Sequence, residues 1–181
     1  MSENLSKSDA CRLRPIKEND LELVLEWRNS FRVRNYMINN HIITIDEHKA
    51  WYNRLLHDDS SHCLIFEMHG EPVGVVNFND IDRERGICFW GFYLGRENLP
   101  KGTGTRMGTL GIKYAFHELG MQKICAKVLE FNQASIRLHQ KLGFVLEGVL
   151  RDHVRRENKL VNLLLYGLNK NENRCDLRCV H

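Results

Sequence analysis

The feature that most constrains this chain is a glycine-containing loop between an apolar strand and a helix. The apolar run Phe89–Leu94 leads into Lys101-Gly-Thr-Gly-Thr-Arg106, and a helical pattern follows. The first turn of a helix has unpaired N–H groups and a partial positive charge, so it attracts anions. The two glycines let a ligand approach the backbone, and the flanking Lys101 and Arg106 add positive charge. The loop therefore predicts a pyrophosphate site, with a plain strand-to-helix turn as the alternative.

Three other glycine loops do not fit these residues. A Walker A loop would end in Gly-Lys-Ser/Thr, whereas positions 104–106 read Gly-Thr-Arg. A dinucleotide fingerprint needs a third glycine where Met107 stands. A nucleophile elbow needs a serine between the glycines, and Thr103 is a poor substitute. The spacing therefore excludes these three loop types and leaves a general anion-binding loop as the interpretation.

Apolar periodicity along the chain predicts a mixed α/β fold. Strands are predicted at 11–15, 63–68, 72–78, 87–94, 124–129, 144–150 and 160–168. Helices are predicted after Asp20, after Thr44 or Asp46, from the glycine loop to Gly120, and from Asn132 to Gly143. Short turns join the second, third and fourth strands, which predicts an antiparallel meander. The charged stretch Asp152–Lys159 is predicted to separate the last two strands.

Composition limits the partners and the compartment. The 181 residues carry 26 Lys and Arg against 23 Asp and Glu, which argues against nucleic acid or a membrane as the main partner. There is no apolar run long enough to span a bilayer and no secretory signal, so a cytoplasmic protein is expected. Polar tails at 1–9 and 170–181 flank one predicted domain at 10–169. Cys175, Cys179 and His181 lack a fourth ligand, so no metal is expected.

A second segment strengthens the pyrophosphate interpretation. Residues 128–144, VLEFNQASIRLHQKLGF, followed by Glu147-Gly148, resemble the last motif of the GCN5-related N-acetyltransferase (GNAT) family. The glycine loop resembles that family's Gln/Arg-x-x-Gly-x-Gly/Ala pyrophosphate loop, with Lys101 in place of Gln or Arg and Arg106 in place of the last small residue. The resemblance covers about 11–168. It implies a mixed, mostly antiparallel sheet of about seven strands with about four helices, splayed between the fourth and fifth strands.

The resemblance implies acetyl-CoA as co-substrate. Its pyrophosphate would meet backbone amides of the glycine loop, and its pantetheine arm would lie along the fourth strand and beside Asn132. For Asn132 an ordinary helix cap is the alternative role. The implied coenzyme-binding residues are Phe92, Tyr93, Leu94, Lys101, Gly102, Thr103, Gly104, Thr105, Arg106 and Asn132.

Two residues are candidates for proton transfer. His139 stands where many family members carry a tyrosine that protonates the departing thiolate. A histidine with a pKa of about 6.5 can protonate a thiolate or donate a hydrogen bond to it; a partly buried helix residue is the alternative. Glu130, at the end of the strand that borders the splay, is the candidate base, acting through a water molecule. A solvated strand end is its alternative role.

The acceptor is less constrained than the coenzyme. Trp27-Arg-Asn29, Tyr36-Met37 and Ile112–Phe116 are similar to the acetyltransferases of pseudaminic acid synthesis, which implies the 4-amino group of UDP-4-amino-4,6-dideoxy-N-acetyl-β-L-altrosamine. The opening Leu13-Arg-Pro-Ile is similar to the RimJ/RimL-like acetyltransferases of ribosomal-protein N-termini, which implies a peptide amine. The third hypothesis is a module that binds the coenzyme without turnover. A homodimer is a possible oligomeric state. The candidate residues of a nucleotide-sugar pocket are Arg28, Met37, His48 and Trp51.

Overall fold

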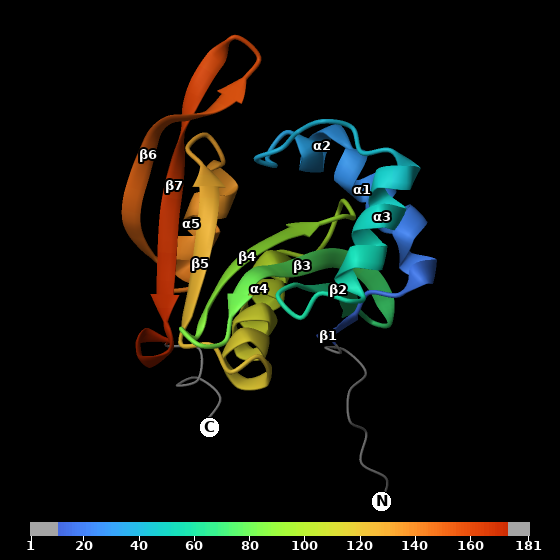
Figure 1. The fold of residues 1–181 in the computed structure, drawn as a ribbon, viewed down its shortest axis with the longest axis horizontal. Helices are drawn as coiled ribbons and strands as arrows, with labels where there is room; N and C mark the ends of the chain where they lie inside the picture. The colour runs from blue at the N-terminus through green and yellow to red at the C-terminus, as the bar shows by residue number, and fades with distance from the viewer. Residues whose placement is uncertain (1–10, 174–181) are drawn as a thin grey trace, which may run out of the picture.

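The computed structural model describes residues 11–173, and its strands form one seven-stranded sheet in the order β1-β2-β3-β4-β5-β7-β6 (Figure 1). The strands are β1 (Cys11–Pro15), β2 (His62–Met68), β3 (Glu71–Asp82), β4 (Ile87–Leu94), β5 (Lys123–Leu129), β6 (Val145–Arg156) and β7 (Lys159–Asn169). Every neighbouring pair is antiparallel except β4 and β5. The predicted mixed, mostly antiparallel sheet and the meander β2-β3-β4 are confirmed. The predicted tail at 1–9 and the cluster of Cys175, Cys179 and His181 lie outside the described residues.

Five α-helices are present among the described residues: α1 (Leu21–Asn29), α2 (Phe31–Arg34), α3 (Ile45–Leu55), α4 (Thr103–Lys113) and α5 (Gln133–Lys141). Side chains fix their starts as the sequence predicts. The Thr44 hydroxyl accepts a hydrogen bond from the Glu47 amide, and the Glu47 carboxylate accepts one from the Thr44 amide, which closes a capping box at α3. The four-residue α2 is additional to the four predicted helices. After α4 the chain widens into a π-helical turn, Tyr114–Glu118, before the positive-φ Gly120.

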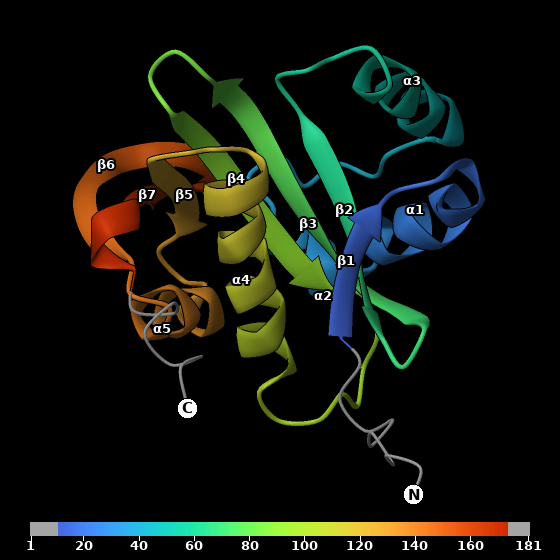
Figure 2. The ribbon, with the colours of Figure 1, turned by 90° about the horizontal axis from the view of Figure 1, so that it is seen from below.

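The helices cover both faces of the sheet (Figure 2). Helices α4 and α5 lie over the larger core, which includes Phe66, Phe78 and Trp90. Helices α1 and α3 cover the opposite face of the N-terminal strands, where Trp27 packs with Ile65 and Val75. Both layers are needed because the central strands bury side chains on their two faces.

The sheet opens between its two parallel strands. Pairing of β4 with β5 joins Ile87–Trp90 to Lys123–Ala126 and ends there. Beyond Trp90, β4 keeps its register with β3, and β5 keeps its register with β7. The two halves of the sheet therefore diverge, as Figure 1 shows, and the predicted splay between the fourth and fifth strands is confirmed.

The prediction that Asp152–Lys159 separates the last two strands was wrong. Strand β6 runs to Arg156, β7 begins at Lys159, and these two residues face each other across a two-residue turn. Glu157 takes a positive φ of 50° in that turn. The hairpin projects beyond the sheet (Figure 1). Most of its charged side chains are exposed, so they do not end the strand.

Candidate active site

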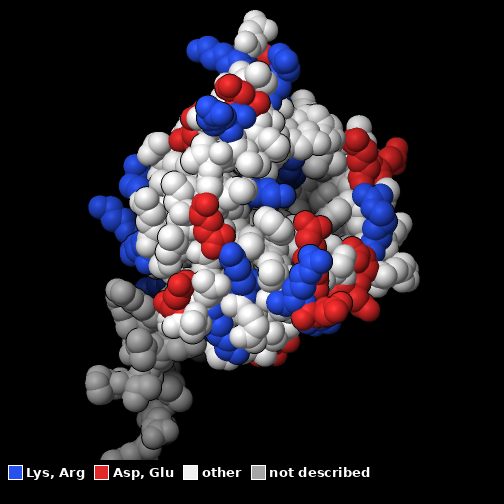
Figure 3. Space-filling view, turned by 60° about the vertical axis from the view of Figure 1, so that its left-hand side comes forward, with Lys and Arg blue, Asp and Glu red and all other residues white. Residues whose placement is uncertain are grey.

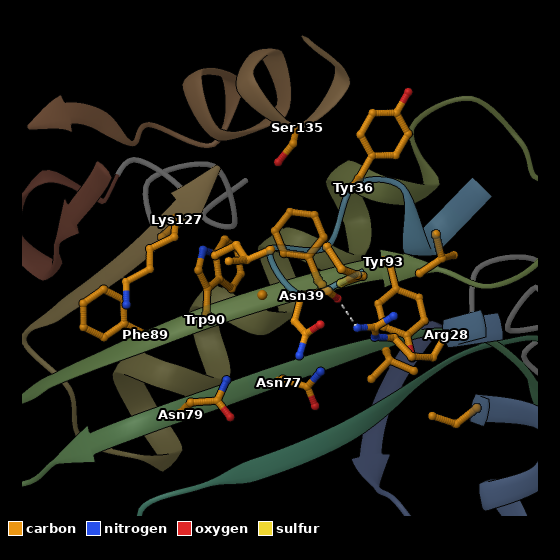
Figure 4. A pocket seen from close by; sticks show the side chains of 18 of the residues that line it. Arg28, Tyr36, Asn39, Asn77, Asn79, Phe89, Trp90, Tyr93, Lys127 and Ser135 are labelled. Atoms are coloured by element: carbon orange, nitrogen blue, oxygen red, sulfur yellow. Dashed lines mark hydrogen bonds between the residues drawn. The ribbon is translucent and has the colours of Figure 1, made fainter. Parts of the chain in front are cut away.

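A cavity of about 990 Å³ occupies the splay and is lined from both faces of the sheet (Figure 4). Successive residues of β4 point to opposite faces. Trp90 and Phe92 lie on the face of α4 and α5, and Tyr93 lies on the face of α1 and α3. We call the part next to α4 and α5 the coenzyme side, and the part next to α1 and α3 the acceptor chamber. The opening between β4 and β5 connects them.

The structure divides the predicted coenzyme-binding residues into two groups. Phe92, Tyr93, Leu94, Gly104 and Asn132 line the cavity. The others, Lys101, Gly102, Thr103, Thr105 and Arg106, lie at the start of α4 and do not line it. The Thr103 side chain is buried, and its hydroxyl donates a 2.7 Å hydrogen bond to the Pro100 carbonyl.

The two glycines of the loop have different structural roles. Gly102 is the N-cap of α4 with a φ of 89°, and a Cβ there would meet nothing within 4 Å. A Cβ at Gly104 would lie 3.3 Å from Leu138 Cδ2, so this glycine lets α4 approach α5. The sequence explained both glycines by ligand approach, whereas the structure also requires them for backbone conformation and for packing.

The residues present fit acetyl-CoA. Gly102 offers no side-chain acceptor to the first turn of α4, which leaves that helix end suited to an anion. Among the described residues, the segment Gly91–Leu94 has no partner strand on its β5 side, so its backbone can pair with the amides of a pantetheine arm. When bound, acetyl-CoA supplies the activated acetyl group.

Asn132 acts as a helix cap in the structure. Its Oδ1 accepts a 3.1 Å hydrogen bond from the Ser135 amide at the start of α5. The residue also lines the cavity, so the cap positions it beside the coenzyme side. Both roles given to Asn132 by the sequence are compatible with this position.

His139 is buried in an aromatic cluster on the coenzyme side. Its side chain contacts Trp90, Phe92, Phe144 and Tyr166, with ring centroids 5.0–5.8 Å away. Its Nδ1 lies 2.8 Å from the Ser135 carbonyl oxygen, and a carbonyl only accepts, so Nδ1 carries the proton. Burial lowers the pKa of His139, which keeps the ring neutral.

Two polar atoms of this cluster lack partners among the described residues. Nε2 of His139 and Nε1 of Trp90 are both buried without a hydrogen bond. The first is an acceptor in the tautomer that Ser135 selects, and the second is a donor. A neutral His139 has no Nε2 proton to give, so the geometry favours hydrogen-bond acceptance over the acid role that the sequence suggested.

Glu130 does not line the cavity. Its two carboxylate oxygens accept hydrogen bonds from the backbone amide and the side-chain amide of Asn162 on β7, at 2.8 and 2.9 Å. These bonds tie the end of β5 to β7. The carboxylate that the sequence suggested as a base is therefore already engaged in hydrogen bonds that join two strands.

The four predicted substrate-binding residues come together in the acceptor chamber. Arg28, Met37, His48 and Trp51 all line it. The His48 ring stacks on Trp51 with centroids 5.0 Å apart, and burial lowers the pKa of His48. The Arg28 guanidinium donates to the Asn39 carbonyl through Nη2, while its buried Nη1 has no partner among the described residues (Figure 4).

Apart from Met37, sequence reasoning missed the roof of the chamber, the loop Met37–Asn40. Three arginines from different elements donate to its carbonyl oxygens. Arg28 on α1 bonds Asn39, Arg34 on α2 bonds Asn40, and Arg156 on β6 bonds Met37 and Ile38. Every residue has a backbone carbonyl, so no sequence pattern could indicate which carbonyls accept these hydrogen bonds. The floor of the acceptor chamber did have a sequence signal that was missed. Asn77 and Asn79 interrupt the apolar strand β3 (Figure 4).

Within residues 11–173, no group of three or more His, Cys, Asp or Glu side chains is placed to hold a metal ion. No helix in the same range is long and apolar enough to cross a membrane.

Comparison with known proteins gives a match to the acetyltransferase (GNAT) domain over residues 11–145. That match covers well over half of the chain, including the glycine loop and α5. The chain belongs to the GNAT family. It is an N-acetyltransferase with acetyl-CoA as co-substrate, as the two motifs predict.

Individual GNAT relatives are distant. The chain is 27% identical to spermidine N(1)-acetyltransferase of Escherichia coli K12, over 81% of this chain and 78% of that one. It is 28% identical to the acetyltransferase PseH of Campylobacter jejuni, over 72% of this chain and 80% of that one. A crystal structure of Vibrio cholerae spermidine N-acetyltransferase with CoA and spermine superposes with a TM-score of 0.85 at 20% identity, covering 90% and 96% of the two chains. These similarities support the fold and the class of reaction.

Proposed function

We propose that the acceptor of this GNAT enzyme is an amine on an anionic small molecule, of which a UDP-linked 4-amino sugar is the best candidate. One observation carries the proposal: Arg28 places in the acceptor chamber a buried guanidinium nitrogen that has no partner within residues 11–173. A buried guanidinium is stabilised by an anion that accepts its remaining hydrogen bonds. A phosphate of the acceptor would supply those acceptors.

The charge of the cavity lining supports the same choice. Of the described residues, its lining includes the basic Arg28, Arg32, Arg54 and Lys127 and the acidic Glu47 and Asp80. A polyamine carries several positive charges and would be repelled by this lining. The spermidine acetyltransferases among the relatives are therefore a guide to the fold and the reaction more than to the acceptor. Asn77 and Asn79 on the chamber floor can donate to and accept from sugar hydroxyls.

In the proposed reaction, the amine enters from the acceptor chamber and attacks the thioester at the opening between β4 and β5. Backbone N–H groups of Gly91–Leu94 are available there to stabilise the oxyanion. The apolar cluster around His139 excludes water from the thioester side. The C–N bond forms as the C–S bond breaks, and the proton that the amine loses ends on the departing thiolate, which gives the free CoA thiol. A thiolate is a tolerable leaving group, so the reaction does not require a strong acid beside it.

The test is a thiol-release assay with acetyl-CoA and three acceptors: the UDP-4-amino sugar, spermidine, and a ribosomal peptide with a free N-terminus. We expect kcat/KM for the sugar nucleotide to exceed the other two by at least about 100-fold. A preference for spermidine or for the peptide would refute the proposed acceptor. Acetyl-CoA binding without thiol release from any acceptor would identify a binding module instead.

Arg28→Met tests the residue that carries the proposal. We expect kcat/KM for the sugar nucleotide to fall by about 10- to 100-fold, with acetyl-CoA affinity unchanged. Arg34→Met is the matched control, because Arg34 also bonds the roof loop but does not line the cavity. An equal loss in both variants would show that the roof, and not an anion contact, determines acceptor binding.

A further inference from the structure

A second cavity adjoins the acceptor chamber beneath the β6–β7 hairpin. Its volume is about 500 Å³, and it lies between the roof loop and the hairpin. Ile38, Asn39 and Lys127 line both this cavity and the acceptor chamber. The two spaces are therefore neighbours that share a wall, and a ligand large enough can occupy both.

The ionisable lining of the second cavity is basic. Lys127, Arg155 and Arg156 contribute three positive charges, and His153 adds a residue that can become positive. No Asp or Glu of the described part of the chain lines the cavity, although Asp152 and Glu157 belong to the same hairpin. Figure 3 shows basic side chains on both sides of the projecting hairpin. Like charges gathered around one space repel each other, and a bound anion relieves that repulsion.

The walls of the second cavity are held in place before any ligand binds. Arg156 crosses from β6 to the roof loop and donates to the carbonyls of Met37 and Ile38. Its Nε is buried and has no partner in the described part of the chain. Because this bridge joins the hairpin to the loop, binding requires little ordering of either segment.

We propose that the second cavity binds a phosphate or diphosphate group. Arginine side chains recognise phosphate through charge-assisted hydrogen bonds, and among the described residues Arg155 and the buried Nε of Arg156 are the donors that the cavity offers. Lys127, whose ammonium lies 4.4 Å from the centre of the Phe89 ring, adds positive charge to the same wall. The group belongs either to the acceptor, whose amine lies in the neighbouring chamber, or to a separate phosphate ligand. The first source rests on the proposed function, and the second does not.

The first experiment measures binding alone. Pyrophosphate is titrated by calorimetry into the full chain saturated with CoA, so that the start of α4 is already occupied. We expect binding that Arg155→Ala weakens by about tenfold or more. Lys159→Ala is the matched control, because it removes the same charge from the same hairpin without lining the cavity; we expect less than a twofold change. Absence of binding, or equal weakening by both substitutions, would overturn the proposal.

The second experiment identifies the source of the phosphate. If the acceptor supplies it, pyrophosphate competes with the sugar nucleotide, and Arg155→Ala raises KM for that acceptor while turnover of a phosphate-free amine is unchanged. If a separate ligand supplies it, pyrophosphate alters turnover of the phosphate-free amine, and Arg155→Ala abolishes the effect. Binding in the first experiment without turnover of any sugar nucleotide would refute the proposed acceptor and leave the phosphate site standing.

Discussion

The Nδ1 atom of His139 lies 2.8 Å from the carbonyl oxygen of Ser135, one turn earlier in α5. This contact assigns the proton to Nδ1 and leaves Nε2 as an acceptor in the cavity. We expect His139→Phe to lower kcat by about tenfold or more with little change in acetyl-CoA affinity. Since burial lowers the pKa of His139, wild-type kcat should decline only below about pH 6.5, and the variant should lose that decline. An unaltered kcat and pH profile would remove His139 from the reaction.

The lowered pKa values of His48 and His139 also make stability depend on pH. Both histidines bind protons more readily in the unfolded chain than in the folded one. Their contribution to stability is therefore complete above the ordinary pKa of about 6.5 and is lost as the pH falls below it. We expect Tm to fall between pH 7.5 and pH 5.5, and His139→Phe to show a smaller fall than wild type. Thermal unfolding followed by circular dichroism measures both, and an equal fall would contradict the assignment.

Glu130→Gln distinguishes a strand tie from a catalytic base. Glutamine keeps one oxygen to accept from the Asn162 amide, so we expect kcat within about twofold of wild type and a loss of about 1 kcal/mol in unfolding free energy. Steady-state kinetics and urea unfolding give the two values. A drop in kcat beyond about 100-fold in a folded variant would restore Glu130 as the base.

Gly104→Glu tests the coenzyme site. A side chain at position 104 would meet Leu138 and carry a negative charge to the end of α4 that the pyrophosphate is expected to occupy. We expect acetyl-CoA affinity to fall by about 100-fold or more, measured by calorimetry. Gly104→Ala is the control for packing, since it adds the contact without the charge. Unchanged affinity in the glutamate variant would refute the loop assignment.

Gly95→Ala tests the packing of the β4 end on α1. A Cβ at Gly95 would lie 1.9 Å from the Trp27 ring, which is itself buried, so the ring or the strand must move. We expect a loss of about 3 kcal/mol in unfolding free energy. Gly91→Ala, within β4 and four residues before Gly95, is the control, because a Cβ there meets no described atom within 4 Å. Denaturant unfolding compares them, and equal stabilities would contradict the close packing.

Local signals in the sequence predicted much of the fold. The caps at Thr44 and Asn132 and the apolar strand at 87–94 each act within a few residues, so they could be read directly. The charged hairpin end was missed because most of its side chains are charged and exposed, and the buried Val154 alone is too little to produce an apolar alternation. Helix α2 was missed because four residues hold too little periodicity.

The sequence could indicate site residues only where the type of side chain itself suggests a function. Arg28, Met37, His48 and Trp51 were chosen by their chemistry, and the structure places all four on the wall of one cavity, whereas their part in binding the acceptor stays a prediction. The role of Glu130 depends on Asn162, which lies 32 residues away and has no signature as its partner. The orientation of His139 likewise depends on a backbone oxygen that any residue at position 135 would provide.

The bridge from Arg156 to Met37 has a consequence for synthesis of the chain on the ribosome. The loop over the acceptor is encoded near the start, whereas the arginine that fastens it lies 119 positions later. A nascent chain that has emerged only as far as α5 contains every predicted coenzyme-binding residue, but it lacks Arg156 and the hydrogen bonds that Arg156 donates to the roof loop. Completion of the acceptor side must therefore await the last hairpin, and so must the second half of the sheet, because β7 in that hairpin is the strand that pairs with β5.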